Sequence, residues 1–143
     1  MSSEAFVYFL RDGEPSTVSS QRVREAFGAF LTEGGGYDWH LHYDDENNCD
    51  VMLKVDDADP NLIQNLTMIR PCADVRLWDA LASVLHLGHA ALFFSSGPPL
   101  LIADAKTAQH LPEGMTESLG KPKRIRTGAD ILREMQECFD REP

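Results

Sequence analysis

The chain has 143 residues, of which 43% are hydrophobic and 25% charged, a composition typical of one soluble globular domain. No apolar run approaches the roughly 20 residues that a membrane-spanning helix needs. The N-terminus shows neither the basic residues nor the apolar length of a signal peptide. The three cysteines include no Cys-x-x-Cys pair, which argues against a disulfide framework or a thiolate zinc site. We therefore expect a cytoplasmic protein.

The net charge of −10 is concentrated in the first part of the chain. Residues 1–60 hold 13 acidic and 4 basic side chains, whereas residues 61–143 hold 10 acidic and 9 basic ones. An acidic surface repels nucleic acid and anionic membranes, and it attracts basic proteins or divalent cations. The densest acidic stretch predicts a surface for a basic protein partner; its residues are Asp44, Asp45, Glu46, Asp50, Asp56, Asp57 and Asp59.

The first part of the chain predicts a strand, a helix and a hairpin. A short apolar run rich in β-forming residues indicates the strand. Apolar residues recurring at helical spacing between Val23 and Leu31 indicate the helix, which the glycines at 34–36 are expected to end. Two alternating runs separated by a polar turn indicate the hairpin. The predicted elements are a strand at 5–10, a helix from Ser19 to the glycines, and strands at 37–43 and 51–55.

The same order of elements then recurs without clear residue identity. A strand, a helix that Asp74 caps and a second hairpin are expected before a C-terminal helical segment. The predicted elements are strands at 66–69, 90–94 and 100–103 and helices at 74–85, 104–111 and 127–139. We therefore predict an α+β fold: a mostly antiparallel sheet built from two tandem β-α-β-β units, with helices on one face. We predict one domain, with units at 5–55 and 64–103 and a C-terminal extension at 104–143.

The alternating run at 37–43 carries the strongest chemical signal. Successive strand residues point to opposite faces, so Tyr37, Trp39, Leu41 and Tyr43 form a face expected to be buried, with Trp39 in the core and His40 exposed. The other face lines up His40 and His42 between Asp38 and Asp44. Imidazole and carboxylate groups suit a divalent transition metal such as zinc, but a complete site needs ligands from elsewhere in the chain. An exposed polar strand face is the alternative interpretation.

The sequence leaves three functions open. One is a non-enzymatic interaction protein, of an inhibitor, immunity or adaptor kind, that binds a basic partner through the acidic stretch. Another is a small-molecule-binding module with an apolar cleft between the two units. The third is a metal-dependent enzyme built on His40 and His42. The cleft would be lined by Trp39, Tyr43, Trp78 and Phe94.

Overall fold

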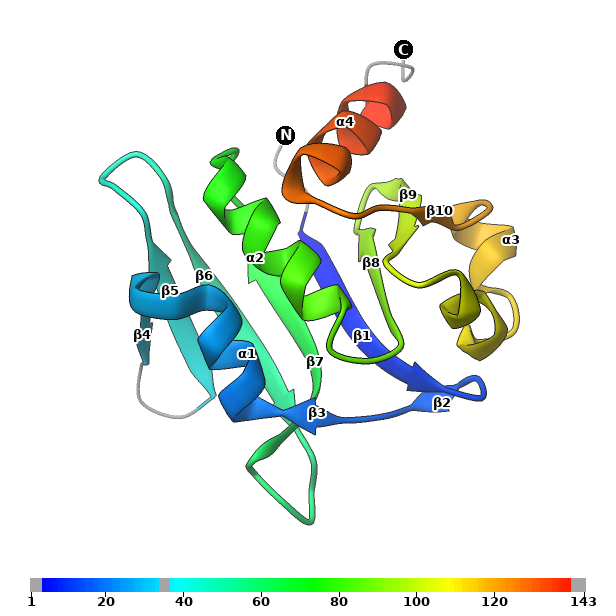
Figure 1. Cartoon of the computed structure of the whole chain (residues 1–143), viewed down its shortest axis with the longest axis horizontal. Coiled ribbons are helices and arrows are strands. Elements are labelled where there is room, and N and C mark those ends of the chain that lie inside the picture. The colour runs from blue at the N-terminus through cyan, green and yellow to red at the C-terminus, as the bar shows by residue number, and fades with distance from the viewer. Residues whose placement is uncertain (1–3, 34–36, 140–143) are drawn as a thin grey trace.

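The protein is built on one mixed, mostly antiparallel sheet (Figure 1). The structure is a computed structural model and describes residues 4–33 and 37–139. The strands follow the order β10-β9-β8-β1-β7-β6-β5-β4, with β2 beside β1 and β3 beside β7. The strands are β1 (Ala5–Arg11), β2 (Glu14–Pro15), β3 (Val18–Ser19), β4 (Leu31–Glu33), β5 (Asp38–His42), β6 (Asn48–Val55), β7 (Leu62–Ile69), β8 (Ala90–Phe94), β9 (Gly97–Ile102) and β10 (Lys123–Arg124).

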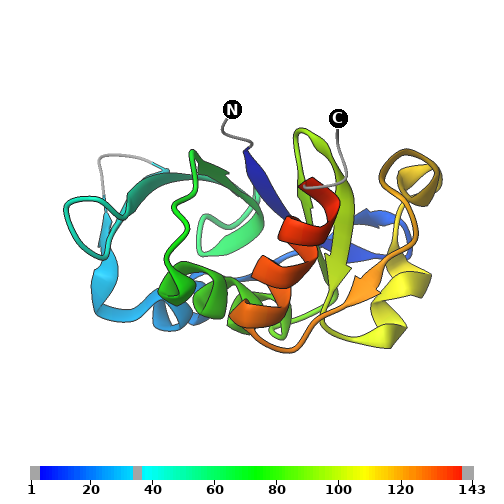
Figure 2. The ribbon, with the colours of Figure 1, turned by 90° about the horizontal axis from the view of Figure 1, so that it is seen from above.

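Three helices cover one face of this sheet: α1 (Ser20–Phe27), α2 (Val75–Leu85) and α4 (Gly128–Phe139) (Figures 1 and 2). Helix α2 lies between the other two and contacts both of them. Its apolar positions recur at helical spacing and are buried against the inward side chains of the central strands. Among those strand side chains, Val7, Leu66 and Leu92 are fully buried. The main core therefore lies between α2 and strands β7, β1 and β8.

The opposite face of the sheet is covered at one end. The segment around α3 (Met115–Leu119) packs over β8, β9 and the end of β1, where it completes a second, smaller core. That core combines Leu10, Ala91 and Leu100 with Leu111, Met115 and Leu119. In the part of the chain that the structure describes, no helix lies over β7, β6 and β5 on this side (Figure 2). We call the outward side of β1, β7, β6 and β5 the open face.

The predicted α+β class is confirmed, and so is the predicted orientation of β5. Trp39 is 3% exposed and the His40 side chain 41% exposed, so they face opposite ways as expected. Tyr37, however, is 57% exposed, and its assignment to the buried face was wrong. Tyr37 lies just before β5, which begins at Asp38, so the strand alternation does not fix its side chain on the buried face.

The first helix ends earlier than predicted. Gly28, at φ 67°, ends α1, because a positive φ breaks the helical conformation at no steric cost to glycine. A 3-10 turn, η1 (Gly28–Phe30), follows, and Leu31 opens strand β4 instead of closing the helix. The glycines at 34–36, expected to end the helix, lie outside the described residues.

The strands of the two predicted units interleave in the sheet. Strand β1 of the first unit lies between β7 and β8 of the second unit. Strand β7 begins at Leu62, earlier than predicted, and β9 begins at Gly97, inside the predicted turn. Strand β10 and α3 were not predicted, and α3 lies on the opposite face from the other helices. No helix in the described residues is both long and apolar enough to cross a membrane.

Helix α4 is fixed to α2 by a close backbone contact. The N–H of Gly128 donates to Asp79 Oδ1 at 2.9 Å, which satisfies one of the free donors at the start of α4. A Cβ added at Gly128 would meet the backbone and carboxylate of Asp79 and lie 2.6 Å from the carbonyl carbon of Trp78. The two helices approach this closely because residue 128 has no side chain.

Gly128→Ala is therefore expected to destabilise the protein by about 1–3 kcal/mol, the usual cost of forcing an extra methyl into a packed site. Gly88→Ala is the matched control, since a Cβ there has open space within 4 Å. Urea unfolding followed by circular dichroism measures both changes. Equal stability of the two variants would show that the α2–α4 contact is not tight.

Candidate partner-binding face

On the open face, side chains from three neighbouring strands form two rows. The register places Asp38 of β5 beside Met52 of β6, which in turn lies beside Thr67 of β7. The next row has His40, Asp50 and Ile69 in the same positions. Because strand side chains alternate, these residues share the outward side while their neighbours enter the core. The face therefore mixes carboxylates with apolar side chains.

Large apolar side chains are unusually exposed here. Tyr37 is 57% and Met52 is 52% exposed, the two highest values among the large hydrophobic residues described. They border a shallow pocket of ≈480 Å³ on the open face. Its lining residues are Tyr37, Asp38, Asp50, Met52, Leu53 and Ile69. Sequence reasoning missed this pocket, although a methionine at an outward position of an alternating strand was a signal for it.

An aromatic cluster continues the apolar surface toward β8. Phe6 lies beside Thr67 on one side and Phe93 on the other. The ring centroids of Phe6 and Phe93 are 5.3 Å apart, and those of Tyr8 and Phe93 are 5.1 Å apart. All three residues are partly exposed. Tyr8 and Phe93 pack against the second core, and only Thr67 separates Phe6 from Met52 of the pocket.

The polar side chains of the open face differ in how far they are already paired. His40 Nδ1 lies 2.8 Å from Asp50 Oδ1, and His42 Nε2 lies 3.6 Å from Asp45 Oδ1. Within the described residues Asp38 has no hydrogen bond or ion pair. The pocket is thus bordered by one unpaired carboxylate and by another that is held in place by a histidine.

The predicted metal ligands do not come together as one site. His40 and His42 have ring centroids 6.3 Å apart, and Asp44 is occupied within its own turn. Across the described ranges, no group of three or more His, Cys, Asp or Glu side chains is arranged to hold a metal ion. The geometry therefore adds no support to the metal prediction.

The acidic stretch runs along β6 and its two flanking loops, and several of its carboxylates accept hydrogen bonds within the protein. Asp44 accepts hydrogen bonds from the backbone N–H groups of Glu46 and Asn47 and from the Asn47 side chain, which lowers its pKa. Asp56 and Asp59 accept from backbone N–H groups in the β6–β7 loop. Asp44 thus shapes the β5–β6 turn, and neutralising it would change the turn as well as its charge.

An arginine joins this turn to the start of α2. The Arg76 guanidinium lies 2.7 Å from Asp74 Oδ2 and 3.4 Å from Asp44 Oδ2. It also lies over two aromatic rings, 5.4 Å from the Phe30 centroid and 5.2 Å from the Tyr43 centroid. Two carboxylates and two ring faces hold one guanidinium, an arrangement suited to its planar, delocalised charge.

Asp74 both caps α2 and pairs with this arginine. Hydrogen bonds from the side chain and backbone N–H of Arg76 lower the pKa of Asp74 to about 2. A carboxyl whose pKa is lowered by folding stabilises the folded state above its ordinary pKa near 4, and this contribution is lost as the pH falls through about 2.

Asp74→Asn should therefore lower the melting temperature at pH 7, and the gap to the parent protein should shrink as the pH falls from about 4 toward 2. Asp57→Asn is the control, because Asp57 is exposed and accepts no hydrogen bond within the described residues. The measurement is thermal unfolding of all three proteins across this pH range. A gap for Asp74→Asn that is the same at both ends of the range would contradict the pairing.

Buried polar groups lie behind the Arg76 site. Burial raises the pKa of the Cys49 thiol to about 12 and raises the pKa of the Cys72 thiol as well. The Tyr43 hydroxyl is buried without a hydrogen-bond partner among the described residues, and desolvation raises its pKa. These groups are kept neutral, which suits a structural role rather than nucleophilic chemistry.

The aromatic residues expected to line a cleft between the units lie in the core. Trp39, Tyr43, Trp78 and Phe94 are at most 8% exposed and belong to the main cluster of buried residues. Trp78 donates its ring N–H to the Cys72 carbonyl at 3.0 Å and packs near Phe94, with ring centroids 6.2 Å apart. Their packing fills the space between the helices and the sheet.

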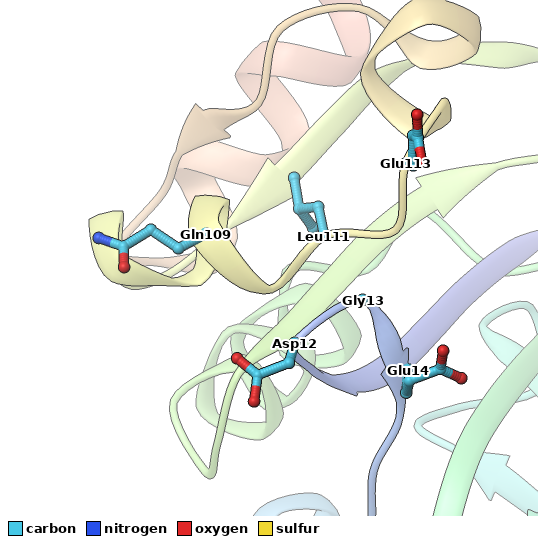
Figure 3. A pocket seen from close by; sticks show the side chains of 6 residues that line it. All are labelled: Asp12, Gly13, Glu14, Gln109, Leu111 and Glu113. Atoms are coloured by element: carbon cyan, nitrogen blue, oxygen red, sulfur yellow. The ribbon is translucent and has the colours of Figure 1, made fainter.

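A second hollow lies beside the β1–β2 turn and has a volume of ≈520 Å³. Figure 3 shows its lining side chains, in which the carboxylates of Asp12, Glu14 and Glu113 point in different directions. Nearby, His89 and His110 stack with ring centroids 4.0 Å apart, and the Asp12 N–H donates to His110 Nδ1. The hydrogen bonds that Asp12 and Gly13 donate to His110 tie the turn to the segment before α3, and the carboxylates do not converge on a common ligand position.

Comparison of the chain with protein-family models, curated protein sequences and solved structures found no match. Function is therefore inferred from the residues of the open face.

Proposed function

We propose that this protein is a non-enzymatic interaction protein whose open face binds a basic protein partner, in an inhibitory, immunity-type or adaptor role. The observation that carries the proposal is the pocket of the open face, which exposed Tyr37 and Met52 line together with Asp38 and Asp50. Apolar side chains exposed in one contiguous patch and rimmed by polar groups are typical of protein-binding surfaces.

The charge around the patch favours a basic occupant. Acidic groups lie at both ends of β6, in the β5–β6 turn and in the β6–β7 loop, and Asp50 lies on the strand between them. In the same region, Lys54 is the one basic side chain among many carboxylates. A partner with complementary positive charge would be steered to this surface, and its apolar residues would then cover Met52 and the aromatic cluster.

Among the described residues, no lysine or arginine of the chain forms an ion pair with Asp38 or Asp50. Lys123 pairs with Glu134 of α4 at 3.5 Å, and Arg124 donates to the Ala103 carbonyl. Arg76 is bound to Asp74 and Asp44. The carboxylates that face outward around the pocket are thus left for a partner.

The proposal is tested with a lysine-rich amphipathic peptide and its glutamate-rich counterpart, whose binding to the protein is measured at about 50 to 500 mM salt. We expect the lysine-rich peptide to bind and its association rate to fall steeply with salt, because the attraction is screened over roughly 8–10 Å. Met52→Lys should weaken binding by about tenfold or more, since the new lysine on the open face would repel the positively charged peptide.

Val75→Lys is the matched control. Val75 is also an exposed large hydrophobic residue, at 44%, but it lies at the start of α2 rather than on the open face. Both substitutions change the net charge equally, so a specific loss with Met52→Lys locates the interface. Equal effects of the two variants, or binding independent of salt, would overturn the proposal. Self-association that Met52→Lys abolishes would make a second copy of this chain the partner.

A further inference from the structure

Resting on the proposed function, we infer that the pocket of the open face is an anchor site for one arginine side chain of the partner, and that it selects arginine over lysine. The site has three parts: a pair of carboxylates, an apolar floor and an exposed aromatic ring. Each part matches one part of an arginine side chain.

The two carboxylates are placed to reach one guanidinium from two sides. Asp38 is directly opposite Met52, and Asp50 is directly opposite His40, so Asp38 and Asp50 are diagonal neighbours across β5 and β6. Diagonal neighbours on one face are about 7–8 Å apart at the backbone, within reach of a shared group that lies between them. A guanidinium offers five N–H donors around its plane, whereas an ammonium is a compact point charge.

The two carboxylates differ in the hydrogen bonds that they already make within the protein. His40 Nδ1 lies 2.8 Å from Asp50 Oδ1 and orients that carboxylate, while Asp50 Oδ2 has no partner within the described residues. Asp38 has no polar partner in the same part of the chain. In contrast, Asp44, Asp56 and Asp59 accept hydrogen bonds from their own turns. The two pocket carboxylates therefore retain the capacity to accept from a ligand.

The apolar parts of the pocket suit the rest of an arginine side chain. Met52 and Ile69 form a floor for its methylene groups, and burying them there is favourable. Tyr37 is more than half exposed and lines the pocket. A guanidinium stacks on such a ring face through its planar, weakly hydrated surface, which an ammonium does less well.

The chain contains an example of the same chemistry within its own fold. Arg76 is held by the carboxylates of Asp74 and Asp44 while it lies over the rings of Phe30 and Tyr43. The pocket of the open face repeats the two carboxylates and an aromatic ring, but no arginine of the described chain pairs with them. A partner's arginine would complete it.

The experiment compares three peptides that differ at one central residue of the lysine-rich amphipathic peptide: arginine, lysine or citrulline, which has the shape of arginine without its charge. Affinities are measured by calorimetry, and contacts are located from backbone amide shifts in ¹⁵N-labelled protein. We expect the arginine peptide to bind about five- to tenfold more tightly than the other two. The largest shifts should lie at residues 38, 50, 52 and 69.

Asp38→Asn combined with Asp50→Asn should remove the arginine preference, whereas Asp45→Asn combined with Asp57→Asn removes the same charge and should leave it. Tyr37→Ala should reduce the preference to about twofold or less, while Tyr37→Phe should keep it because the ring remains. Amide spectra of each variant confirm that it is folded.

An arginine preference below about twofold, or one that survives Asp38→Asn with Asp50→Asn, would overturn the inference. These failures are distinct from failure of the proposed function. If the lysine-rich peptide still binds and Met52→Lys still weakens it, the open face is the interface and the arginine anchor alone is wrong. If none of the three peptides binds, the proposed function and the arginine anchor are both wrong.

Discussion

The packing of α2 against the central strands is the constraint on which the rest of the structure depends. This helix fills the middle of one side of the sheet and contacts α1 and α4, one on each side (Figure 1). Its side chains Leu77, Leu81 and Val84 are fully buried, and each such burial contributes roughly 1.5–3 kcal/mol of hydrophobic stabilisation. Because this single layer of helices supplies the core, the sheet can leave most of its other side uncovered.

The open face follows directly from that one-sided arrangement. A strand buried on both sides requires apolar residues throughout, whereas β5 and β6 alternate and need apolar residues on one side only. Their outward positions are thus free to carry carboxylates, histidines and an exposed methionine without loss of the core. The segment around α3 covers the far end of this side with its own small core. The uncovered part of this side of the sheet is therefore limited to β1, β7, β6 and β5.

The acidic residues divide into two groups that the composition does not separate. Asp44, Asp74 and Asp130 accept several hydrogen bonds each, and those bonds lower their pKa values. They shape a turn and begin two helices. Asp38 and Asp50 have few internal contacts and stand beside exposed apolar side chains. A negative net charge therefore contains both structural charge, which the fold uses, and outward charge, which is free to attract a partner.

Local patterning determined much of what the sequence predicted correctly. Alternation set the inward and outward sides of β5 and β6, helical spacing located α2 and α4, and the capping residue Asp74 marked the start of α2. These features depend on neighbours within a few residues, where backbone geometry relates spacing to direction. Gly28 shows the limit, because the apolar spacing continued through it although its backbone ended the helix.

Tertiary structure alone decided how distant segments met. No local pattern indicates that β1 lies between β7 and β8, that α3 covers the opposite side of the sheet, or that Gly128 contacts α2. The candidate site shows the same division: Asp38 and Asp50 could be named in advance, but the pairing of Asp38 with Met52 and of Asp50 with Ile69 across the strands could not. Strand register and helix docking depend on contacts between residues far apart in the chain, and a short local pattern is compatible with several such pairings.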